Sequence, residues 1–217
     1  MNRKYLVPVG LTISLTCMLT AILLYPGGTY QDRNTTGFHW TNNYISNLFE
    51  AKALNGAPNP SRVWASLAMI LLPVTYAIFF FNMAARLPDR NAKIILKYAS
   101  IANIACMFLI ATKLHDLMLN VSITLFWTCI LVVTTFVLRS KLTLLKVACI
   151  VCLAFFYFGI FLWATNNGTW MPTMQKLNFI TSALLILALE YSTSAKEFSH
   201  IQPRRKKNVR SSVETSQ

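Results

Sequence analysis

Six long apolar stretches constrain this chain more than any other feature of its sequence. They cover Tyr5–Tyr25, Val63–Ala85, Ile94–Thr112, Leu117–Leu138, Val147–Thr165 and Leu177–Ser194. Each stretch is close to the ~20 residues that a helix needs to cross a hydrocarbon core about 30 Å thick. Unpaired backbone polar groups are not tolerated in lipid, so each stretch must form a helix or a strand of a closed barrel.

The local pattern favours helices over barrel strands. Strands of a membrane barrel alternate between apolar and polar residues, whereas Met69–Leu72 and Phe79–Phe81 are continuously apolar. Composition agrees, because only 12% of the 217 residues are charged, against about 25% in a soluble domain. We therefore predict an all-α fold, in which residues 1–195 form a six-helix transmembrane bundle and the first stretch is a retained anchor rather than a signal peptide.

The basic residues predict how the chain is oriented in the membrane. With a cytoplasmic N-terminus, most of the 20 Lys and Arg residues fall on the inner side, namely Arg3, Lys4, Arg86, Arg90, Lys93, Lys97, Arg139, Lys141, Lys146, Lys196, Arg204, Arg205, Lys206, Lys207 and Arg210. The positive-inside rule then places both termini in the cytoplasm, and Trp64, Trp163 and Trp170 near the outer interface. Orientation thus explains the net charge of +13 without a nucleic-acid partner. Residues 196–217 are expected to be a disordered basic tail that is attracted to anionic membrane lipids.

The connection formed by residues 26–62 is the only long one, and by this orientation it lies on the outer side of the membrane. Structureless loops of that length are uncommon unless they are functional or disordered. Ile45, Leu48, Phe49 and Ala53 recur at helical spacing within residues 43–54. We therefore expect a structured outer loop with a short amphipathic helix over residues 43–54 that caps the bundle.

Polar residues of this loop and of the fourth helix form our candidate site. The predicted ligand-binding residues are Asp32, Asn43, Asn47, His115, Asp116 and Asn120. A histidine can act as a general base or a metal ligand when a carboxylate orients it. If the protein is an enzyme, His115, Asp116 and Asp32 are the catalytic candidates. Neighbouring helical residues point about 100° apart, so His115 and Asp116 need a further partner. We predict neither a cofactor nor a metal.

Polar residues also occur within the apolar stretches, where they are costly and usually face the bundle interior. We predict a structural ion pair between Lys97 and Glu190; in the alternative, each side chain reaches the headgroups separately. Polar stripes on four helices would either join the helices by hydrogen bonds or line a substrate path. Cys149 and Cys152 are interpreted as small core residues rather than a redox or metal pair.

Several short motifs carry a family resemblance. They are Tyr25-Pro26-Gly27-Gly28, Asp32, Gly37-Phe38, Trp40, the run from Asn42 to Leu48, Asn55-Gly56, Asn59 and His115. Together they resemble bacterial six-helix membrane proteins that are similar to the DRAM/Frag/Sfk group, although Asn47 stands where that group's Ile-Ser-Asp-like motif has an acidic residue. The resemblance implies a polytopic membrane protein with a structured outer loop and a lipid or membrane-trafficking role, without an agreed chemistry.

The sequence is therefore interpreted as a bacterial inner-membrane protein that binds a lipid headgroup or a small polar ligand in an outward-facing pocket. No motif identifies it as an enzyme. A membrane-embedded lipid hydrolase, metal-assisted or not, is one alternative and would use His115, Asp116 and an acid of the loop. A small-solute transporter is the other, with Glu190 and Lys97 as its inner gate. The chain shows no internal repeat, which disfavours the transporter.

Overall fold

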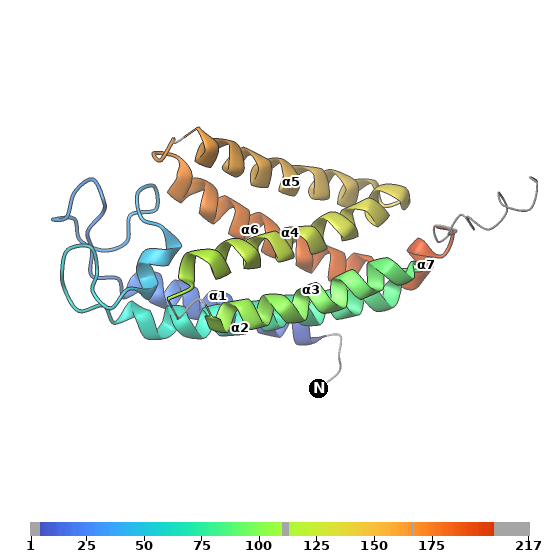
Figure 1. Ribbon diagram of the computed structural model, residues 1–217, viewed down its shortest axis with the longest axis horizontal. Coiled ribbons are helices and arrows are strands. Elements are labelled where there is room, and N and C mark those ends of the chain that lie inside the picture. Colours follow the sequence, from blue (N-terminus) through green and yellow to red (C-terminus); the bar gives the residue numbers. More distant parts are fainter. Residues whose placement is uncertain (1–4, 110–112, 166, 202–217) are drawn as a thin grey trace, which may run out of the picture.

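The computed structural model describes residues 5–109, 113–165 and 167–201. Six long helices run side by side in an elongated bundle (Figure 1). They are α1 (Leu6–Leu23), α2 (Ser61–Arg86), α3 (Arg90–Leu109), α4 (His115–Arg139), α5 (Thr143–Ala164) and α6 (Met171–Ser192). All six are long and apolar enough to cross a membrane. The predicted all-α fold with six transmembrane helices is confirmed, and the chain is an integral membrane protein.

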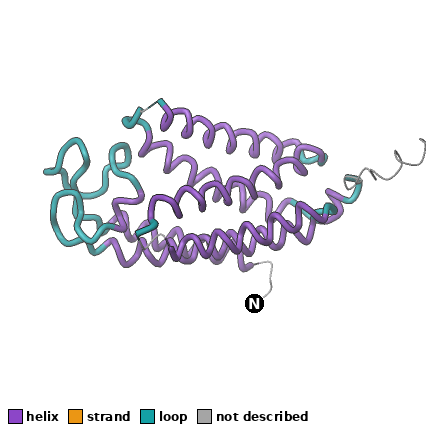
Figure 2. Tube along the Cα trace, viewed as in Figure 1, coloured by secondary structure: helices purple, strands orange, loops and turns teal. Residues whose placement is uncertain are grey.

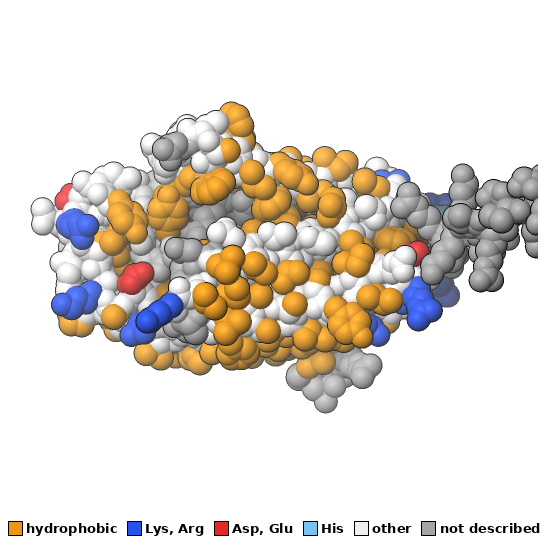
Figure 3. All heavy atoms as spheres, in the orientation of Figure 1, with side chains coloured by type: hydrophobic (Ala, Val, Ile, Leu, Met, Phe, Trp, Pro, Cys, Tyr) orange, Lys and Arg blue, Asp and Glu red, His pale blue; other side chains and the backbone are white. Residues whose placement is uncertain are grey.

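The two ends of the bundle differ, as Figure 2 shows. The connection between α1 and α2 is gathered at one end, which we call the loop end. The short helix α7 (Ala195–Phe198) lies at the other, which we call the tail end. Hydrophobic side chains cover the middle of the visible face, and Lys and Arg side chains lie towards the two ends (Figure 3). This distribution matches an apolar belt between two polar boundaries.

Helix pairing follows the order of the chain. α1 packs along α2, α3 packs along both α2 and α4, and α5 packs on α6. Gly10 of α1 lies so close to Thr75 of α2 that a Cβ atom at Gly10 would overlap the threonine hydroxyl. Small residues at such crossings let two membrane helices approach closely. The glycine therefore sets the close contact of the first two helices.

Aromatic stacking connects α2, α4 and α5 in the core. Tyr76 of α2 stacks on Phe126 of α4, with ring centroids 5.0 Å apart. The next residue, Trp127, stacks on Phe156 of α5 at 4.1 Å. Such ring pairs contribute about 0.5–1.5 kcal/mol beyond their buried area. They attach α5 to α4 although much of α5 faces outward.

The loop is structured, but its predicted helix over residues 43–54 is too long. Only Ile45–Phe49 is helical, as the 3₁₀ helix η2. Asparagine side chains bind the loop's backbone groups and so compete with the hydrogen bonds of a longer helix. The helical spacing still identified buried positions, because Leu48 is 0% and Ala53 4% exposed. Both pack with residues of α1 and α2, so the loop caps that end of the bundle.

The prediction of a disordered tail from residue 196 onward is wrong for its first residues. Residues 195–198 form α7, which packs against α2. Phe198 is 0% exposed and Ile201 7% exposed, so two apolar side chains of this basic segment join the main core. The burial of these two side chains orders the segment. Residues 202–217 of the predicted tail lie outside the described part of the chain.

Candidate ligand-binding site

Two predicted site residues, Asn43 and Asn47, hold the loop in its folded form. The Asn43 side chain is 0% exposed; its Oδ1 accepts from the His39 N–H at 2.8 Å and its Nδ2 donates to the Gly28 carbonyl at 2.8 Å. Asn47 accepts from the Tyr44 N–H at 2.7 Å and donates to the Tyr30 hydroxyl at 3.4 Å. In both side chains, the amide oxygen accepts one hydrogen bond and the amide nitrogen donates one. Asn47 also positions two tyrosines.

Asn59 connects the loop to the start of α2. Its Nδ2 donates to three backbone carbonyls, those of Asn47, Leu48 and Glu50, the last at 2.9 Å. Its Oδ1 accepts from both the N–H and the hydroxyl of Ser61. Buried polar groups need such partners, and here a single side chain satisfies several of them. Apart from the resemblance, no sequence pattern pointed to a role for Asn59.

Lys176, in the second turn of α6, is buried, and no described carboxylate pairs with it. It is 6% exposed, and its Nζ donates to the carbonyls of Pro172 at 2.7 Å and Asn43 at 2.5 Å. The ammonium also lies 5.4 Å from the centroid of the Phe38 ring. Among the described side chains no carboxylate oxygen is within 4.0 Å of it. Buried lysines are normally paired with a carboxylate. The partners of Lys176 are carbonyl dipoles and an aromatic ring, which attract the ammonium but carry no net negative charge to neutralise it.

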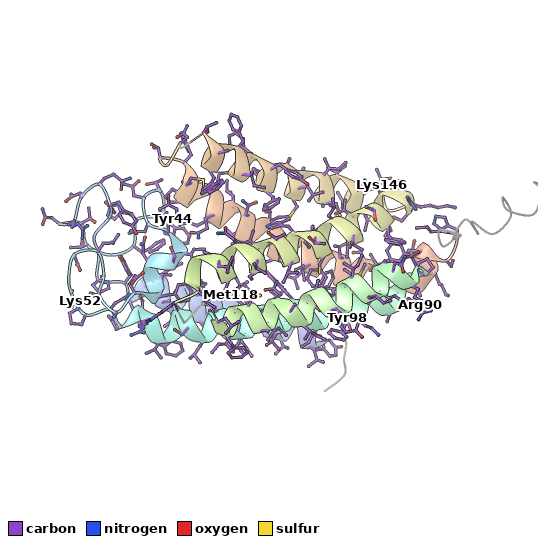
Figure 4. The ribbon with its side chains drawn as sticks, viewed as in Figure 1. Tyr44, Lys52, Arg90, Tyr98, Met118 and Lys146 are labelled. Carbon is purple, nitrogen blue, oxygen red and sulfur yellow. The ribbon has the colours of Figure 1, made fainter. Side chains whose placement is uncertain are left out.

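A cavity of about 370 Å³ opens at the loop end, and its wall includes Pro172, whose carbonyl accepts from Lys176. Its lining residues come from the loop, from the α5–α6 connection and from the start of α6: Tyr30, Gln31, Asn42, Tyr44, Gly168, Thr169 and Pro172. Figure 4 shows Tyr44 where the loop approaches α6. None of these lining residues is acidic. Lys176 does not line the cavity but is hydrogen-bonded to its wall: its two acceptors are the carbonyls of Pro172, a lining residue, and of Asn43, which lies between the lining residues Asn42 and Tyr44.

The two tyrosines of the cavity form one unit. Their rings meet edge to face, with centroids 6.2 Å apart. Burial raises the pKa of the Tyr44 hydroxyl above its usual value, and the neighbouring Tyr30 adds to the effect. Tyr44 therefore remains protonated at neutral pH and is able to donate a hydrogen bond. With Asn42, Gln31 and Thr169, it gives the cavity a wall rich in neutral donors.

The remaining predicted site residues do not line the loop-end cavity, or their side chains are outside the described part of the chain. Asp32 is exposed, and its Oδ1 accepts from the Asn34 N–H at 2.9 Å in a loop turn. Asn120 is on an exposed part of α4. The backbone of His115 and Asp116 begins α4, but their side chains lie outside the described part of the chain. Their roles in binding or catalysis stay predictions.

The predicted ion pair between Lys97 and Glu190 is wrong in its cation. Glu190 Oε1 is 3.0 Å from Arg86 Nη2 and accepts from Asn82 Nδ2 at 2.9 Å. Arg86 also donates to Thr193 Oγ1 at 3.1 Å. Arg86 and Asn82 project from α2, which packs against α6, whereas Lys97 is exposed on α3. The forked guanidinium thus reaches three acceptors on α6: the Glu190 carboxylate, the Leu189 carbonyl and the Thr193 hydroxyl.

All five cysteines are free and buried, and Cys149 and Cys152 are core residues as predicted. Within the ranges that the structure describes, no three His, Cys, Asp or Glu side chains gather as metal ligands would.

Comparison of the chain with protein-family models, with curated proteins and with solved structures found no match. Function is therefore inferred from the geometry of the loop-end cavity.

Proposed function

We propose that this membrane protein binds the anionic group of a lipid headgroup or of a small polar ligand in the loop-end cavity. The observation that carries the proposal is the buried Lys176 ammonium, which is hydrogen-bonded to the backbone of a cavity wall that has no acidic residue. An anion in the cavity would neutralise this charge in a poorly solvated place, where electrostatic attraction is stronger than in water.

The chemistry of the wall fits a phosphate or a carboxylate. The Tyr44 hydroxyl, the Asn42 amide and the Thr169 hydroxyl offer neutral donors, and charge-assisted hydrogen bonds to an anion are roughly twice as strong as neutral ones. A volume of about 370 Å³ is in the lower part of the ~300–1,000 Å³ range of small-molecule sites. This size suits a headgroup or a small solute. The resemblance to the DRAM/Frag/Sfk group also favours a lipid role.

Filling the cavity tests the proposal. A Cβ at Gly168 would meet nothing within 4 Å, so Gly168→Phe adds its ring without a backbone clash. We expect the compound bound by the wild-type protein to fall at least tenfold in Gly168→Phe, since the ring occupies its place. Mass spectrometry of the organic and aqueous extracts of purified protein measures the loss and separates a lipid from a small solute.

The neighbouring Asn167→Phe is the matched control, because Asn167 is exposed and does not line the cavity. It should retain the wild-type amount of bound compound. Extracts of wild-type protein and both variants that contain the same compounds in the same amounts would contradict the proposal. A compound lost equally from both variants would do so too.

The orientation of the protein is part of the proposal. We infer that the loop end faces outward and that both termini are cytoplasmic, in the inner membrane of a bacterium. Support comes from the basic residues at the tail end, with Arg86, Arg90 and Arg139 at helix termini and Lys141 in the turn before α5. Exposed Trp163 and Trp170 at the loop end agree with this orientation.

A membrane-impermeant maleimide tests this orientation. In intact cells with a permeable outer layer we expect Asn34→Cys, in the loop, to be labelled at once. Arg90→Cys, at the tail end, should react only after the inner membrane is opened, because the reagent cannot cross lipid. Mass shift on a gel measures both. Labelling of Arg90→Cys in intact cells, with Asn34→Cys protected, would reverse the orientation.

A further inference from the structure

A second cavity lies at the tail end, between α5 and α6, and the proposed function does not use it. Its volume is about 640 Å³. The lining residues come from the start of α5 and the end of α6: Lys141, Leu142, Thr143, Leu144, Leu145, Ala148, Val151, Cys152, Thr181, Leu184, Leu185, Ala188 and Ser192. Figure 4 shows this region by the label of Lys146, close to the start of α5.

The burial of the lining side chains gives the cavity the shape of a groove. Leu145, Cys152 and Leu185 are 5%, 1% and 3% exposed and form its floor. Leu144 and Leu184 are 82% and 61% exposed and form its rims. Both helices are membrane-spanning, so the groove opens sideways towards the hydrocarbon of the bilayer. Its contents must therefore be apolar along most of its length.

The length of the groove matches one leaflet. From Thr181 to Ser192 on α6, a rise of 1.5 Å per residue gives about 16 Å. This is about half of a hydrocarbon core ~30 Å thick. The groove thus runs from the tail-end boundary of the membrane to near its midplane. That is the depth reached by an acyl chain of a single leaflet, and a ligand entering from the other leaflet would not fill it.

The mouth of the groove is basic. Lys141 lies in the turn before α5 and is exposed, with the hydroxyl residues Thr143 and Ser192 beside it on the lining. None of the lining residues is acidic. An ammonium with hydroxyl groups is a complement to a phosphate, and basic pockets between membrane helices bind the headgroups of anionic lipids.

We propose that this groove binds one acyl chain of an anionic phospholipid from the tail-end leaflet, with its phosphate against Lys141. The chain fills the apolar part between α5 and α6, and the headgroup remains at the membrane boundary. The site is independent of the loop-end cavity, so either can fail without the other.

Native mass spectrometry of the full chain, released from nanodiscs of equal phosphatidylglycerol and phosphatidylcholine, tests the headgroup contact. We expect wild-type protein to retain phosphatidylglycerol in preference to phosphatidylcholine. Lys141→Ala should reduce the retained phosphatidylglycerol about fivefold, the equivalent of the ~1 kcal/mol of one basic residue near an anionic lipid. Lys146→Ala is the matched control, since Lys146 is in the first turn of α5, five residues from Lys141, but outside the groove. It should change retention less than twofold.

Two filling variants test the acyl-chain contact from opposite walls. Ala148→Phe and Ala188→Phe each place a ring in the groove, and each should reduce the retained phosphatidylglycerol at least tenfold. Ala154→Phe adds the same ring at an exposed site of α5 outside the groove and should retain the lipid. Gel filtration of each variant confirms a folded protein. The proposal is overturned by equal losses in Lys141→Ala and Lys146→Ala, by unchanged retention in both filling variants, or by equal retention of phosphatidylcholine.

Discussion

Replacing Arg86 by alanine is expected to lower the free energy of unfolding by about 3–5 kcal/mol, because it leaves a buried carboxylate without its cation. The Glu190 side chain is only 3% exposed, and Arg86 Nη2 lies 3.0 Å from its Oε1. Removing the guanidinium also takes donors from Thr193 and from the Leu189 carbonyl. Unfolding in mixed micelles by increasing fractions of sodium dodecyl sulfate measures the loss.

Two further variants separate charge from packing. Arg90→Ala removes an exposed arginine at the same end of the bundle and should cost less than 1 kcal/mol. The double variant Arg86→Leu with Glu190→Leu removes both charges and should recover most of the loss, because an apolar pair can replace a buried ion pair at little cost. If Arg86→Ala unfolds like the wild type, the pair does not stabilise the fold.

Asn59→Asp is expected to open the loop and to lower its local stability by about 3 kcal/mol, the upper range for a buried group that loses its hydrogen bonds. The substitution keeps size and shape but replaces the Nδ2 donor by oxygen. That oxygen would face the three carbonyls to which Asn59 donates. The rate of limited proteolysis between η2 and α2 measures the opening and should rise by about a hundredfold, in line with 1.4 kcal/mol per factor of ten.

Asn55→Asp is a suitable control within the same loop. Asn55 is exposed, and its Oδ1, which an aspartate retains, accepts from the Ala57 N–H at 3.0 Å. This variant should be cleaved at the wild-type rate. If Asn59→Asp is cleaved no faster than Asn55→Asp, the three hydrogen bonds that the Asn59 amide donates do not stabilise the loop.

Sequence patterns predicted the features that depend on a single segment of the chain, namely the length of each helix and the burial of individual residues. The apolar stretches mark the six helices, and the spacing of Leu48 and Ala53 marks loop residues that become buried. The extent of the loop helix was beyond that pattern. It depends on asparagine side chains that bind backbone groups distant in the chain, such as Asn43 and the Gly28 carbonyl.

Partnerships across helices were the least predictable part. Depth in the membrane suggested Lys97 for Glu190, but the packing of α2 on α6 brings Arg86 to it instead. Lys176 had no acidic neighbour in the sequence to mark it as buried, because its partners are carbonyl oxygens and the Phe38 ring. The available signal was a lone lysine at the start of an apolar stretch. Such a lysine can also extend its ammonium to the headgroups, so the pattern does not distinguish a buried lysine from an exposed one.

The burial of every native thiol has a practical consequence. Cys17 and Cys106 are the most exposed of the five, at 8% each, and each sulfur is on a membrane-spanning helix. Thiols shielded in this way are inert towards water-soluble reagents. The native cysteines therefore need not be replaced before labelling. Spin labels or fluorophores attached to single introduced cysteines would report distances without a signal from the native thiols.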